Sequence, residues 1–111
     1  MRRLEVRYQD SASEDLQGIY LYLVSRGVSV SSARVYVMRI RESCSRIGDA
    51  AEGGRRRNDL APGLRSWAFE RRAVITYRIE KDVVIVENAF YGGRDIDAIY
   101  AKQLRRGDET S

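Results

Sequence analysis

Apolar and polar residues alternate at the N-terminus and then recur at steps of three and four. Leu4, Val6 and Tyr8 are separated by charged residues, which predicts a short strand with one buried face. The sequence Ser11–Glu14 has the pattern of a capping box, so we expect a helix to begin there and to end near Gly27. The apolar stripe of this helix consists of Ala12, Leu16, Ile19 and Leu23.

A second helical pattern follows after only a few residues. Ser29, Ser31 and Ser32 are candidates to cap its N-terminus, and Gly48 is expected to end it. Its apolar stripe consists of Ala33, Val37, Ile40, Cys44 and Ile47. Because the connection is short, the two helices are expected to pack as an antiparallel hairpin. Their apolar stripes leave one side to be covered, which a sheet would do.

The second half of the chain has the pattern of strands. Residues 51–63 are polar and rich in glycine, contain Arg55-Arg56-Arg57, and are expected to form a loop. Three strands are then expected, at residues 64–69, 73–79 and 83–91. The last of them is apolar on both faces over most of its length, which indicates a central strand. A short helix is expected after Asp95, and the tail from about residue 105 is expected to be frayed.

This order of elements predicts a single α+β domain over residues 1–111. An N-terminal strand would precede an antiparallel helical hairpin packed on one face of a curved antiparallel sheet, and a short C-terminal helix would follow. A domain of 111 residues can build one core but has little material for a deep, enclosed substrate pocket.

Composition excludes several classes of chemistry. The chain has no histidine and one cysteine, Cys44, so a conventional zinc site, a serine triad and an internal disulfide are all excluded. No cofactor or metal is expected. The N-terminus becomes charged at once, without a secretory signal, and no apolar run approaches the ~20 residues needed to span a bilayer. A cytoplasmic protein without a membrane partner is therefore expected.

The charges favour a macromolecular partner. The formal net charge is +4, and all but two of the 20 basic residues are arginines, the exceptions being Lys81 and Lys102. Arginines and aromatic residues are concentrated toward the C-terminal strands, a composition typical of surfaces that bind RNA or protein. The candidates are Arg65, Trp67, Arg71, Arg72, Tyr91, Arg94 and Tyr100. Several of these aromatic residues are equally compatible with packing in the core.

The first helix carries more apolar surface than a helical hairpin requires, since residues 19–24 are almost continuously apolar or aromatic. We expect some of Tyr20, Leu21 and Val24 to stay exposed until an amphipathic segment of a partner covers them. That partner should be acidic, to match this basic chain. The alternative is that the sheet covers all three.

Four segments of the chain resemble the RelE/ParE superfamily of toxins, and ParE in particular. They are Gly63-Leu64-Arg65-Ser66, Val74–Ile79, Val83–Val86 and Tyr91-Gly92-Gly93-Arg94-Asp95. Residues 15–23 are similar to the first helix of that family. The resemblance extends from about Leu4 to Tyr100, although Tyr91 stands where the family usually has a histidine.

This resemblance implies a toxin of a type II toxin–antitoxin pair. ParE toxins inhibit DNA gyrase, whereas RelE-like relatives cut mRNA on the ribosome. A ParD-like antitoxin would form a hetero-oligomer with the toxin, and only the antitoxin would contact operator DNA. A ribonuclease of this superfamily would use Arg65, Arg94 and Tyr100, but the basic residue expected in the middle strand falls near Val74 and is missing.

We therefore favour a gyrase inhibitor without catalytic residues of its own. Its toxicity surface would include Trp67, Arg71, Arg94 and Tyr100, and its antitoxin surface Tyr20, Leu21 and Val24. A ribosome-dependent mRNA endoribonuclease is the first alternative. A non-toxic remnant that only binds an antitoxin-like partner is the second.

Overall fold

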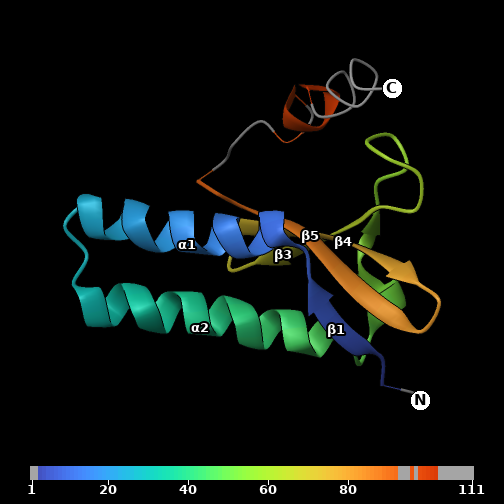
Figure 1. Cartoon of the computed structure of the whole chain (residues 1–111), viewed down its shortest axis with the longest axis horizontal. Helices are drawn as coiled ribbons and strands as arrows, with labels where there is room; N and C mark the ends of the chain where they lie inside the picture. The colour runs from blue at the N-terminus through green and yellow to red at the C-terminus, as the bar shows by residue number, and fades with distance from the viewer. Residues whose placement is uncertain (1–2, 93–95, 97, 103–111) are drawn as a thin grey trace.

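A computed structural model describes residues 3–92, 96 and 98–102 of the chain. Helices and strands follow one another in the order drawn in Figure 1. They are β1 (Glu5–Tyr8), α1 (Asp10–Ser25), α2 (Val30–Ile47), the 3-10 turn η1 (Ala51–Gly53), β2 (Arg55–Arg56), β3 (Arg65–Phe69), β4 (Ala73–Glu80) and β5 (Val83–Tyr91). Residues 98–102 are helical as well. The predicted α+β order of strand, helical hairpin, strands and short helix is confirmed.

The five strands form one mixed sheet in the order β1-β5-β4-β3-β2. Strands β2 to β5 pair antiparallel, but β1 pairs parallel with β5, from Glu5 opposite Val83 to Tyr8 opposite Val86. The expected antiparallel pairing is confirmed for β3, β4 and β5, but the parallel pairing of β1 makes the sheet mixed, which the expectation of an antiparallel sheet missed. Alternating residues define the two faces of a strand but not the direction of its neighbour, which here follows from the return of the chain after the helices. Strand β5 has a partner on each side, as its apolar faces predicted.

The loop predicted at residues 51–63 contains more structure than expected. Ala51–Gly53 form one 3-10 turn, and Arg55 and Arg56 form an edge strand that pairs with Ser66 and Arg65 of β3. Both side chains of β2 are exposed. Because neither β2 side chain is buried, the strand leaves no apolar pattern in the sequence to detect.

The predicted N-terminal cap is confirmed for helix α2 but is wrong for helix α1. Helix α2 begins after Ser29, whose Oγ accepts a hydrogen bond from the backbone N–H of Ser32 (3.2 Å), as predicted. Helix α1 begins one residue before the predicted capping box, and its N-cap residue Gln9 forms no side-chain cap. Ser11 Oγ instead donates to the backbone carbonyl of Glu87 on β5 (2.6 Å). A tertiary contact has replaced the local cap.

The helical hairpin covers one face of the sheet (Figure 1) and forms the main core with it. Leu16 of α1, Ile40 of α2, and Ile75 and Tyr77 of β4 are almost fully buried there. A smaller cluster lies on the opposite face and consists of Leu60, Leu64, Phe90 and Tyr100, with Ala61, Ile96 and Ile99 packed against it. No helix in the described part of the chain is both long and apolar enough to cross a membrane.

Candidate interaction surfaces

Aromatic rings from four elements meet near the end of β5. The ring centroids of Tyr22 and Tyr91 are 5.9 Å apart, those of Tyr36 and Tyr91 5.8 Å, and those of Tyr36 and Phe69 5.7 Å. These separations are typical of tilted or edge-to-face aromatic pairs. We call Tyr22, Tyr36, Phe69 and Tyr91 the aromatic cluster.

Arginines surround the aromatic cluster. The guanidinium of Arg26 lies 5.9 Å from the ring centroid of Tyr22, and that of Arg39 lies 5.7 Å from the ring of Phe69. Arg39 also forms an ion pair with Glu70 in the turn between β3 and β4. Tyrosine and arginine are enriched among the residues that dominate binding energy at protein interfaces. The composition of this region is therefore that of a protein-binding surface.

The hydroxyl of Tyr36 is buried without a hydrogen-bond partner among the described residues. Its pKa is raised, chiefly by burial and next by the neighbouring Tyr91, while Arg72 and Arg39 act in the opposite direction. A buried hydroxyl without a partner costs about 1–3 kcal/mol. Tyr36 therefore stays protonated at neutral pH and contributes its ring, not a charge, to the aromatic cluster.

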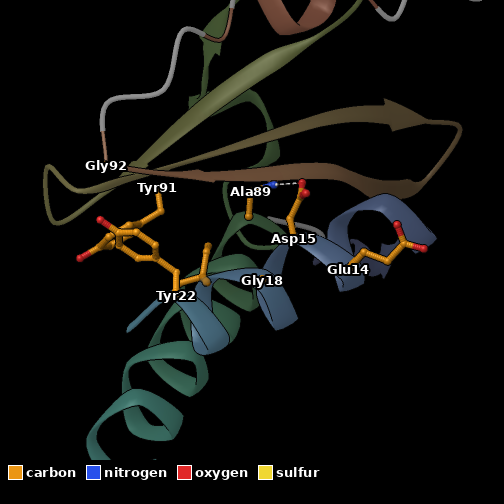
Figure 2. Close-up of a pocket in the computed structure, with 8 residues that line it drawn as sticks. Glu14, Asp15, Gly18, Tyr22, Ala89, Tyr91 and Gly92 are labelled. Atoms are coloured by element: carbon orange, nitrogen blue, oxygen red, sulfur yellow. Dashed lines mark hydrogen bonds between the residues drawn. The ribbon is translucent and has the colours of Figure 1, made fainter. Parts of the chain in front are cut away.

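Two open grooves flank helix α1. The α1–β5 groove, drawn in Figure 2, has a volume of about 460 Å³. It is lined by Glu14, Asp15, Gly18, Ile19 and Tyr22 of α1 and by Ala89, Tyr91 and Gly92. Asp15 Oδ2 accepts hydrogen bonds from Asn88 Nδ2 (2.9 Å) and from the backbone N–H of Ala89 (3.0 Å), which fixes α1 to β5.

The second groove lies between the two helices and has a volume of about 390 Å³. This α1–α2 groove is lined by Ser13, Leu16, Gln17 and Tyr20 of α1 and by Arg34, Val37, Met38 and Arg41 of α2. Leu16 forms its apolar floor, and Met38 is exposed beside it. Arg34 and Arg41 stand two helical turns apart, so the groove combines an apolar strip with positive charge.

The predicted antitoxin-binding residues lie on α1 in three different environments. Leu21 is 55% exposed, Tyr20 lines the α1–α2 groove, and Val24 is half-buried against the main core. Tyr22, which the sequence analysis did not single out, is 50% exposed beside Leu21. Part of the apolar surface of α1 therefore stays open to solvent.

The predicted ribonuclease residues Arg65 and Tyr100 lie on opposite faces of the sheet. Arg65 pairs with Tyr77, which faces the helical hairpin, and the neighbouring pair Ser66–Thr76 faces the other way. The Tyr100 hydroxyl donates to Thr76 Oγ1 (2.6 Å) and so lies on that second face. The sheet itself separates the two side chains.

Both residues also have structural roles. One Arg65 nitrogen donates to the backbone carbonyls of Glu52 (2.9 Å) and Gly54 (3.1 Å), which fastens the η1 turn to β3. Tyr100 is only 4% exposed. Burial raises the pKa of Tyr100 to about 12, with smaller contributions from Glu87 and Asp15 in the same direction and an opposing one from Thr76.

The other predicted toxicity residues are also distributed over more than one surface. Trp67 is half-buried on the helix-covered face, where its Nε1 donates to Ser43 Oγ of α2 (3.1 Å). Arg71 is exposed in the turn between β3 and β4. Arg94 lies outside the described residues. Trp67, Arg71 and Tyr100 therefore do not form one continuous patch.

Sequence reasoning missed the helical side of the aromatic cluster. Tyr91 was a candidate, but Tyr22 was noted only within the nearly continuous apolar run of residues 19–24, and Tyr36 only flanks the apolar stripe of the second helix. One signal was available, because an aromatic residue beside a complete apolar stripe exceeds what the core needs. Helical spacing does not show that these two tyrosines contact the strand residues Tyr91 and Phe69.

The fold is shared with a solved protein. A chain described as "Chromosomal ParDE TA system from P. aeruginosa" superposes with a TM-score of 0.71 at 21% sequence identity, over 81% of this chain and 97% of that one. At that identity the similarity shows a common fold. No curated protein matches the sequence.

Sequence comparison identifies the family. Residues 6–88 match the family described as the ParE toxin of the type II toxin–antitoxin system parDE. Since the match covers more than half of the chain, the chain belongs to the ParE toxin family.

Proposed function

We propose that this ParE-type toxin arrests growth by inhibiting DNA gyrase and that a ParD-like antitoxin neutralises it. The observation that carries the choice of target is the placement of Arg65 and Tyr100 on opposite faces of the sheet. A ribonuclease needs a base and phosphate-binding charges around one phosphodiester. Two members of that set are separated by the sheet and occupied in structural contacts, which supports an inhibitor that acts by binding.

The gyrase contact is proposed for the exposed arginines beside the aromatic cluster. Arg71 is exposed in the β3–β4 turn, next in sequence to Arg72, and Arg94 follows β5 in the sequence. Trp67 and Tyr100 would support this surface from within the fold, since both are tied to other elements by hydrogen bonds. Arginine beside tyrosine suits a protein surface that is already bound to DNA.

The antitoxin contact is proposed for helix α1 and the α1–α2 groove. Exposed Leu21 and the apolar strip with Tyr20 and Met38 would receive the apolar face of an amphipathic segment. Arg34 and Arg41 at the edge of the strip would pair with acidic residues of that segment. An acidic partner also fits the net charge of +4.

A plasmid supercoiling assay with purified gyrase and ATP tests the target. We expect loss of supercoiling as the toxin is added, and linear DNA after proteinase treatment. An Arg71→Ala variant should weaken inhibition about tenfold, while Glu42→Gln, an exposed change on α2, should leave it intact. Unchanged supercoiling at large toxin excess would contradict the gyrase proposal, and mRNA cleavage on ribosomes would then favour the ribonuclease alternative.

A further inference from the structure

Helix α1 contains a glycine that the fold itself does not require. A Cβ atom built on Gly18 would meet nothing within 4 Å, although glycine is the poorest helix former after proline. Alanine would therefore fit the same backbone and favour the helix. Gly18 is exposed and lines the α1–β5 groove, where a residue without a side chain leaves room for another chain to approach the helix closely.

The two ends of the α1–β5 groove differ in chemistry. Figure 2 shows the rings of Tyr22 and Tyr91 together at one end, Asp15 and Glu14 toward the other, and Gly18 between them. Among the described residues, neither Glu14 nor Asp15 forms an ion pair. Tyrosine faces attract cations, and carboxylates pair with them. The groove thus has the chemistry of a cation site on a chain that is basic overall.

Arginine satisfies both ends better than lysine does. Its aliphatic stem packs along a ring while its planar guanidinium, further along the groove, donates several hydrogen bonds to carboxylates, whereas the ammonium of lysine is a compact, strongly hydrated charge. A volume of about 460 Å³ leaves room for such a side chain and for part of the backbone that carries it. Glu14, Gly18 and Tyr22 are exposed on the α1 side of the groove, so a side chain can enter from a segment that lies across the helix.

The position of the groove on α1 indicates which partner supplies that side chain. Leu21 is exposed one turn beyond Gly18, between the α1–α2 groove on one side of the helix and the α1–β5 groove on the other. A segment that covers Leu21 therefore passes close to Gly18 and reaches both grooves.

We propose that the antitoxin segment lays an arginine side chain along the α1–β5 groove, with its aliphatic stem against Tyr22 and its guanidinium paired with Glu14. This inference rests on the proposed neutralisation by an antitoxin. The segment would place acidic residues over Arg34 and Arg41 on one side of α1 and this arginine in the α1–β5 groove on the other side. The groove would then select for a specific charge pattern, beyond the general attraction between a basic toxin and an acidic partner.

Calorimetric titration of the full-length toxin with its purified ParD-like antitoxin tests the proposal. Glu14→Gln should weaken binding about tenfold, by removing one member of a partly desolvated charge pair. Gly18→Leu should weaken it about a hundredfold, because the side chain fills the groove. Asp15 is left unchanged because it holds α1 to β5.

Two controls show whether a loss of affinity comes from the groove itself, from a general change of charge or from misfolding of the toxin. Glu42→Gln makes the same charge change on an exposed part of α2 and should alter the affinity less than twofold. Thermal melts followed by circular dichroism should show that Gly18→Leu folds as the wild type does. If Gly18→Leu is misfolded, the affinity of Glu14→Gln alone tests the proposal.

A double-mutant cycle then identifies the side chain. Each arginine of the antitoxin is changed to glutamine and measured against wild-type toxin and Glu14→Gln. Changing the inserted arginine to glutamine should weaken binding to the wild-type toxin, but it should weaken binding to the Glu14→Gln toxin little further. Wild-type affinity for both groove variants, or the absence of any coupled arginine, would overturn the inference and leave the proposed function standing. No binding by wild-type toxin would overturn the proposed neutralisation itself.

Discussion

One face of the sheet lies under the helical hairpin, whereas the other is covered by the loop before β3 and by residues near the C-terminus. The first face buries a continuous core contributed by both helices and by strands β3, β4 and β5. The second buries Leu60, Leu64, Phe90 and Tyr100. Apolar area dominates the first face, while the second combines a small apolar cluster with a polar network.

That polar network joins the two faces at an irregularity in the sheet. The β4–β5 register shifts between Thr76 and Tyr77, opposite Asn88 and Val86. Asn88 donates to Asp15 of α1 and lies 3.4 Å from the Tyr100 hydroxyl, which donates to Thr76. The same two residues, Tyr100 and Asn88, therefore link the C-terminal helical residues to α1. The comparison teaches that Tyr100, a candidate site residue in the sequence, also forms hydrogen bonds that connect the C-terminal helical residues to the sheet.

The largest expected effect comes from the helix-covered face. Ile40→Ala should lower the free energy of unfolding by about 4 kcal/mol, because Ile40 is fully buried between α2 and the sheet. Leu64→Ala on the opposite face should cost about 2 kcal/mol, since its smaller cluster can collapse around the lost side chain. Urea denaturation of both variants measures the difference. An equal or larger loss for Leu64→Ala would contradict this comparison.

A smaller effect is expected from the polar network. Tyr100→Phe keeps the ring beside Phe90 but removes the hydrogen bond to Thr76, and should cost about 1 kcal/mol of unfolding free energy. Tyr20→Phe is the matched control, because the Tyr20 hydroxyl has no hydrogen bond among the described contacts. If both variants were equally stable in urea, the network would not stabilise the second face.

Alkaline pH should weaken the contribution of the Tyr100 hydroxyl to stability. The pKa of Tyr100 is about 12 in the folded chain, raised from an ordinary value of 10. The folded state therefore holds this proton more tightly than the unfolded state. The stability that Tyr100 contributes is complete below pH 10 and is lost as the pH rises through 10 to 12. Denaturation between pH 9 and pH 12 should show a shallower loss of stability for Tyr100→Phe than for wild type, and parallel curves would exclude this role.

The smallest effect on stability is expected from the exposed surface of α1. Leu21→Ala should change the free energy of unfolding by less than about 0.5 kcal/mol, because Leu21 is half-exposed. The same variant should bind the antitoxin about tenfold more weakly, if Leu21 contributes to the interface as proposed. Denaturation and calorimetric titration of one preparation measure both quantities. A destabilised variant with unchanged antitoxin affinity would assign Leu21 to the fold.

Local patterns determined much of this protein before any tertiary contact was considered. Apolar spacing located both helices, the three long strands and the interior position of β5, and Ser29 identified the start of α2. These features depend on the period of a helix or strand and on hydrogen bonds between near neighbours. The ParE resemblance, carried by segments along most of the chain, agreed with the family match.

Only the tertiary structure decided which of those elements meet. It paired β1 parallel with β5, placed Arg65 and Tyr100 on opposite faces, and brought Tyr22, Tyr36 and Tyr91 together from separate elements. It also replaced the expected cap at Ser11 with a bond to β5. Periodicity identifies the faces of an element, but long-range packing determines what each face contacts. For this chain, long-range packing places Arg65 and Tyr100, which the family resemblance groups together, on opposite faces of the sheet.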